Sequence, residues 1–135
     1  MSTMLANISL RAWHPILTAD EISSRLELPS RFAHNVSEPR RSPSGQVLDG
    51  YYELSYVSMP LIRKKTIELD EELSLWCEVL EPREQILREI VCSGGKVEFY
   101  VSLFVSGLGG FELEQGLLAR VGAMGLGLSV EIYTE

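Results

Sequence analysis

The chain has 135 residues, of which 45% are hydrophobic and 23% are charged, and its formal net charge at pH 7 is −7. These proportions exclude a disordered chain and are typical of a globular protein large enough to form a hydrophobic core. The negative charge argues against binding to nucleic acid or to an anionic membrane surface, because both repel an acidic protein.

The sequence predicts a single domain over residues 1–135. No apolar run approaches the length of a membrane span, and the first residues lack a basic segment followed by an apolar one. We therefore expect a cytoplasmic protein without a membrane partner.

The first predicted strand covers residues 7–13, where Ile8, Leu10 and Ala12 alternate with polar residues. A short helix should follow, because Thr18 can cap its first turn while Glu21 reaches back as the third helical residue. Residues 29–50, rich in proline and glycine, predict a long loop. Loops of this length in compact domains are often functional or mobile.

A second strand is expected over residues 51–59, with Tyr51 and Glu53 on the same side. Helical spacing of apolar residues then predicts helices over 69–80, 82–91 and 113–124, and alternation predicts strands over 96–105 and 126–133. The order β-α-β-α(α)-β-α-β predicts an α+β two-layer sandwich, with a four-stranded mixed or antiparallel sheet and the helices on one face.

Three segments, SLRAWHPILTADEISSRLELPSR, EPRRSPSGQVLDGYY and GLGLSVEIY, together resemble the bacterial domain of unknown function 4279 family. The likeness covers nearly the whole chain and rests on a first strand, a capped T-x-x-E-I helix, a Pro-Ser step and a closing Asp-Ile-Tyr motif, in which Glu131 replaces the Asp in this chain. The resemblance implies a small bacterial α+β domain to which no activity is assigned.

The strand residues that should point away from the helices are unusually rich in aromatic rings, whereas a sheet face in water is usually polar. A contiguous aromatic surface with charged edges is typical of a site for a partner or for self-association. Its candidate residues are Trp13, Tyr51, Glu53, Tyr100, Phe104, Glu131 and Tyr133. Alternatively, the 29–50 loop folds over this face and the rings form a second core layer.

Within the loop, Arg31, His34, Arg40 and Arg41 could bind an anionic ligand, because guanidinium groups hold carboxylates and phosphates through paired hydrogen bonds. They could equally be solvated loop charges. We assign no catalytic residue, metal ligand or cofactor: no nucleophile has a neighbouring base, and neither histidine has a ligand spacing from the acidic residues near position 70.

Two hypotheses follow. The first is a non-enzymatic binding module that engages a protein partner or a second copy of itself through the aromatic face, with an immunity- or antitoxin-like role in bacteria as one form. The second is a small domain that binds an anionic ligand, or an unrecognised enzyme, with its site under the 29–50 loop.

Overall fold

The computed structural model describes residues 3–134 and has an α+β architecture. Its strands are β1 (Met4–His14), β2 (Phe32–His34), β3 (Pro39–Arg41), β4 (Val47–Tyr51), β5 (Ser55–Ile67), β6 (Lys96–Val105) and β7 (Leu126–Thr134). Its helices are α1 (Ala19–Leu26), α2 (Leu69–Leu80), α3 (Glu84–Cys92) and α4 (Gln115–Ala123), with a 3-10 turn, η1 (Glu81–Arg83), between α2 and α3.

Five strands form the main sheet in the order β2-β5-β1-β6-β7, and β3 and β4 form a separate two-stranded sheet. The central strand β1 is antiparallel to both β5 and β6. The last two strands, β6 and β7, run parallel, with α4 connecting them. The sheet is therefore mixed.

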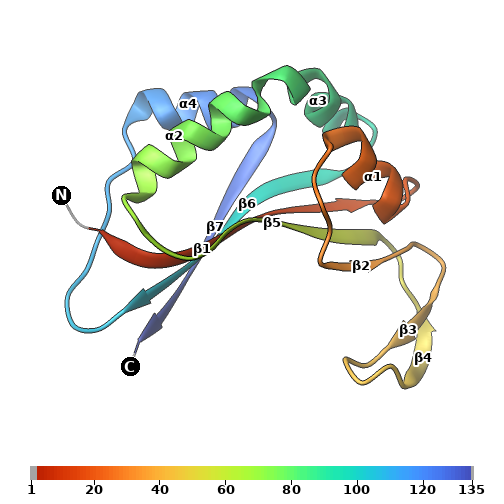
Figure 1. Ribbon diagram of the computed structural model, residues 1–135. Helices are drawn as coiled ribbons and strands as arrows, with labels where there is room; N and C mark the ends of the chain where they lie inside the picture. Colours follow the sequence, from red (N-terminus) through yellow and green to blue (C-terminus); the bar gives the residue numbers. More distant parts are fainter. Residues whose placement is uncertain (1–2, 135) are drawn as a thin grey trace.

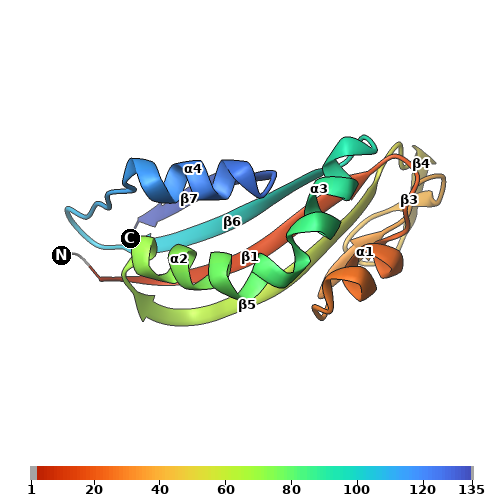
Figure 2. The ribbon, with the colours of Figure 1, turned by 90° about the horizontal axis from the view of Figure 1, so that it is seen from above.

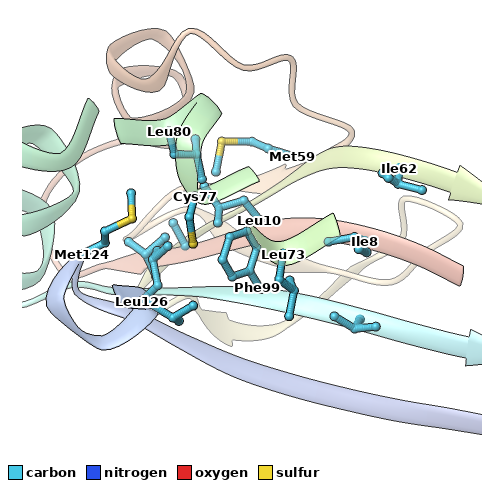
Figure 3. Close-up of a cluster of buried hydrophobic side chains, with 14 of the residues drawn as sticks. Ile8, Leu10, Met59, Ile62, Leu73, Cys77, Leu80, Phe99, Met124 and Leu126 are labelled. Atoms are coloured by element: carbon cyan, nitrogen blue, oxygen red, sulfur yellow. The ribbon is translucent and has the colours of Figure 1, made fainter. Parts of the chain in front are cut away.

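All four α-helices lie on one side of the main sheet, so the molecule has two layers (Figures 1 and 2). Strand alternation produces this arrangement: Ile8, Leu10 and Ala12 of β1 are fully buried beneath the helices, and the residues between them point the other way. Phe99 on β6 lies at the centre of the core, next to Leu73 and Cys77 of α2 (Figure 3). The predicted sandwich with helices on one face is confirmed.

The beginning of α1 follows the predicted capping. The backbone N–H of Glu21 donates to the Thr18 hydroxyl over 3.2 Å, and that hydroxyl lies 3.3 Å from the Glu21 carboxylate. Just before it, Nδ1 of the buried His14 accepts the backbone N–H groups of Ile16 and Leu17 at 3.0 and 2.9 Å. His14 thus fixes the turn that takes the chain from β1 into α1.

The four-strand count was wrong, because residues 29–50 are not a simple loop. Residues Phe32–His34 pair with β5 and add a fifth strand at the edge of the sheet. The β3–β4 hairpin then projects from one end of the sheet, on the side away from the helices (Figure 1). A three-residue strand is too short to show periodicity, so this edge could not be read from sequence alone.

The predicted strand over residues 51–59 was placed too early. Tyr51 belongs to the hairpin strand β4, Glu53 lies in the connection after it, and β5 runs from Ser55 to Ile67. As a result Tyr56, rather than Tyr51, lies on the sheet face away from the helices, where it is paired with Trp13. Among residues 3–134, no helix is long and apolar enough to cross a membrane.

Candidate functional site

The face of the main sheet opposite the helices, which we call the open face, has no helix of residues 3–134 over it (Figure 1). Strand register places aromatic side chains from all five strands on it. They are Trp13, Phe32, His34, Tyr56, Tyr100, Phe104 and Tyr133. Of these, Phe32 is 58% exposed and Tyr133 is 46% exposed, so the rings are not sealed beneath the described part of the chain.

Four of the predicted partner-binding rings share the open face, but they are not all adjacent. Phe104 and Tyr133 stack at one end, with ring centres 5.2 Å apart. Trp13 lies at the other end, 5.3 Å from Tyr56, and Tyr100 lies between the two groups. Tyr51 and Glu53 do not belong to the face, because Tyr51 lies on the hairpin strand β4 and Glu53 lies in the connection before β5.

A nearly buried ion pair occupies the middle of the open face. Arg11 donates from Nε and Nη2 to one oxygen of Glu98, at 3.1 and 2.6 Å. The Arg11 guanidinium also lies 3.8 Å from the centre of the Tyr100 ring and 5.2 Å from that of Trp13. Burial alone would raise the pKa of Glu98, but hydrogen bonds from Arg11 and Ser129 and the nearby positive charges outweigh it and lower the pKa.

Glu131 and Tyr133 are linked on β7. The Tyr133 hydroxyl donates to the Glu131 carboxylate over 2.8 Å, and this hydrogen bond, together with the neighbouring Tyr100, raises the pKa of Tyr133 to about 12. The same bond lowers the pKa of Glu131. Both side chains therefore keep their usual charge states at neutral pH, with Glu131 negative and Tyr133 neutral.

A groove of about 660 Å³, here the hairpin groove, lies between the hairpin and the end of the open face. Its walls include a stack of rings: His34 lies parallel to Tyr52 with centres 3.5 Å apart, and Tyr56 lies 5.6 Å from His34. Phe32 and Tyr56 also line a smaller hollow of about 270 Å³, whose walls include Tyr100. The two depressions therefore share a wall and follow the open face from the hairpin towards its centre.

The four candidate anion-binding residues do not converge. His34 and Arg41 line the hairpin groove, whereas Arg31 lines the neighbouring hollow and lies over the Phe32 ring. Arg40 donates to the backbone carbonyl of Asp49, within the hairpin. Only His34 and Arg41 could therefore contact one ligand in the groove.

His34 is largely uncharged at neutral pH. Its partial burial lowers the pKa of the imidazole, and the opposing effects of the Glu38 carboxylate and of a hydrogen bond to the Leu54 backbone are smaller. The Nδ1 atom is buried and has no hydrogen-bond partner in the described part of the chain. A buried ring nitrogen without a partner is a position where a ligand could donate or accept a hydrogen bond.

Sequence reasoning missed Phe32, Tyr56 and the pairing of Arg11 with Glu98. Phe32 lies on a strand too short for a periodic signal, and Tyr56 was assigned to the opposite face with the strand that began too early. Glu98 is 87 positions from Arg11, so their contact depends on strand order. For Tyr56, the alternation of buried Val57 and Met59 would have been the usable signal.

Among residues 3–134, no group of three or more His, Cys, Asp or Glu side chains is arranged to hold a metal ion. Comparisons with protein-family models, with curated proteins and with solved structures found no match. The resemblance to the bacterial domain of unknown function 4279 family therefore stays a prediction.

Proposed function

We propose that the protein is a non-enzymatic binding module that engages a protein partner, or a second copy of itself, through the open face. The observation that carries this proposal is the exposure of a ring-rich sheet surface with no helix over it. Aromatic side chains bury a large area at a low cost in conformational entropy, which is why they dominate the centres of protein interfaces.

The arrangement of charge on the open face supports the same role. The charges at its centre are already paired, since Glu98 contacts Arg11 at 2.6 Å and Lys96 at 3.5 Å. A partner that covers this face would not leave those charges buried and unpaired, which would otherwise weaken binding. An immunity- or antitoxin-like role in bacteria is one form that such a function would take.

The test uses a variant that removes the two open-face rings with the greatest exposure, Phe32→Ser with Tyr133→Ser. The control is Ile16→Ser, which removes an apolar side chain in the turn after β1 that is more exposed (74%) than either of the two rings. Sedimentation velocity over a range of concentrations measures self-association, and affinity capture with each variant as bait measures partner binding.

We expect the face variant to lose association in one of these two measurements while the Ile16 variant keeps it, and both to retain the circular dichroism spectrum of the wild type. If the face variant associates as the wild type does in both measurements, the open face is not the binding surface.

The second candidate function is binding of a small anionic ligand in the hairpin groove, favoured by the unpartnered Nδ1 of His34 beside Arg41. A thermal-shift screen of anionic metabolites tests it, because a ligand that binds only the folded state raises the midpoint of unfolding. Arg41→Ala should abolish any such shift, and Arg40→Ala, outside the groove, should not. The absence of any shift across the screen would contradict this candidate.

A further inference from the structure

The charge of the molecule is divided unequally between its two layers. The segments that form the helical layer, 18–27, 68–92 and 111–124, contain thirteen Asp and Glu against four Arg, a net charge of −9. The rest of the chain contains six acidic and eight basic residues, a net charge of +2. The acidity of the protein therefore belongs to the helical layer, on the side opposite the open face.

Much of this charge surrounds a groove of about 410 Å³ between α2 and α4, which lie side by side in the helical layer (Figure 2). Its walls carry Asp70, Glu71 and Glu78 from α2 and Glu114 from the start of α4. A smaller hollow of about 130 Å³ shares Asp70 and Glu114 with it and adds Glu68, Phe111 and Glu112. We call the two together the acidic groove; no Lys or Arg of the described residues lines either part.

The acidic groove also has apolar walls that remain exposed. Leu75, inside the groove, is 51% exposed, and Leu117 lines it from α4. On the outer surfaces of the same helices, Val79 and Leu118 are 52% and 49% exposed. The outer face of a surface helix is usually polar, so a cluster of exposed aliphatic side chains among carboxylates is the pattern of an interaction surface.

The helix dipole explains only part of the acidity. Negative side chains are favourable in the first turn of a helix, and this accounts for Asp70 and Glu71 of α2 and for Glu114 next to α4. It does not account for Glu78, which lies in the last turn of α2, where the dipole disfavours negative charge and the helix has no basic residue.

The carboxylates also repel one another. A hydrogen bond to Glu68, followed by the charges of Glu68 and its acidic neighbours, raises the pKa of the exposed Glu71. Because the carboxylates do not converge on a point that could hold a metal ion, they are suited to cationic groups spaced along a chain.

We propose that the acidic groove binds a basic amphipathic segment of a protein partner. Lys or Arg side chains of that segment pair with Glu71, Glu78 and Glu114, and its apolar side chains cover Leu75 and Leu117. This goes beyond the proposed function, because the surface lies on the opposite layer from the open face and can be occupied independently of it.

The probe for this test is a synthetic peptide of Lys and Leu with leucines at helical spacing, and its control is a peptide of the same composition in scrambled order. The groove variant, Glu78→Lys with Glu114→Lys, is compared with Glu84→Lys and Glu89→Lys on α3, which change the net charge equally outside the groove. Calorimetric titration measures affinity, and circular dichroism confirms that each variant is folded.

We expect the groove variant to lose about tenfold or more in affinity and the α3 variant to lose much less at physiological salt, where screening limits distant charges. The scrambled peptide should bind more weakly than the amphipathic one. Equal losses in the two variants, or equal affinities for the two peptides, would indicate non-specific charge attraction and would overturn the proposal.

Amide chemical shifts of the wild-type protein locate the bound peptide without any variant. The peptide should change the shifts of residues in α2 and α4, and changes centred elsewhere would contradict the proposed site. The open-face variant Phe32→Ser with Tyr133→Ser should bind the peptide as the wild type does. If the experiments contradicted one of the two proposed binding surfaces, the proposal for the other would still stand.

Discussion

Arg11 and Glu98 form a two-donor contact across β1 and β6, in which Nε and Nη2 of the guanidinium both donate to Oε2 of the carboxylate. The Glu98 side chain is only 3% exposed and that of Arg11 is 23% exposed. On a sheet face without a helix over it, this pair is in contact with the rings of Trp13 and Tyr100.

Glu98→Gln should lower the free energy of unfolding by about 2 to 3 kcal/mol, because it leaves the Arg11 charge largely buried without its counter-ion. The loss should be below that for a fully buried pair, because Arg11 keeps some contact with water. Urea unfolding followed by circular dichroism measures it. Replacing both partners by apolar groups, Arg11→Met with Glu98→Leu, should recover much of the loss, and a Gln variant as stable as the wild type would contradict this account.

Stability should fall as the pH drops below about 6.5, because of His14. Burial lowers the pKa of this imidazole below its ordinary value of 6.5, so the unfolded chain takes up a proton that the folded protein does not. The stabilising effect is complete above pH 6.5 and is lost as the pH falls towards the lowered pKa. Because Nδ1 accepts two backbone N–H groups, Nε2 carries the proton and donates to Ser93 Oγ over 2.8 Å.

The comparison is between wild type, His14→Asn and His34→Gln, with urea unfolding measured at several pH values between 5 and about 7.5. Asn at position 14 can still accept a backbone N–H but does not titrate. We expect each variant to remove part of the pH dependence, since burial lowers the pKa of both histidines. If the free energy of unfolding of His14→Asn depended on pH as that of the wild type does, His14 would not be the cause of the pH dependence.

Replacing glycine by alanine should lower the stability of the protein at Gly95 and raise it at Gly122. A Cβ at Gly95, between α3 and β6, would lie 2.7 Å from the Ile90 carbonyl oxygen and 2.8 Å from that of Trp13, so Gly95→Ala should cost about 1 to 3 kcal/mol. A Cβ at Gly122, in α4, would meet no atom within 4 Å, so Gly122→Ala should add about 0.5 to 1 kcal/mol through better helix propensity. Thermal unfolding of both variants shows whether each substitution stabilises or destabilises the protein. Stabilisation by Gly95→Ala would contradict the close packing around Gly95.

The architecture could be predicted where local signals agree with one another. Thr18 and Glu21 mark the start of α1, and the regular alternation over residues 96–105 matches β6, because successive side chains of a strand point to opposite faces of the sheet. The strand near Tyr51 was misplaced because YYELSYV fits two starting points, and only pairing with β1 selects Ser55.

The candidate site was less predictable because it depends on contacts between distant residues. Four of its rings follow from strand phase, but the pairing of Arg11 with Glu98 and the stacking of His34 on Tyr52 arise from strand order and from the path of the hairpin. Similarly, the acidic groove exists because α2 and α4 lie side by side, which no local pattern specifies.

The position of β1 at the centre of the sheet has a consequence for synthesis on the ribosome. Of the elements described here, β1 is translated first, yet its neighbours β5 and β6 are translated only after residues 54 and 95. A nascent chain that has reached the end of α3 can pair β1 along one edge only, leaving the other edge and its apolar side chains without their native neighbour. The protein should therefore need chaperone protection, or rapid completion of translation, until β6 is inserted.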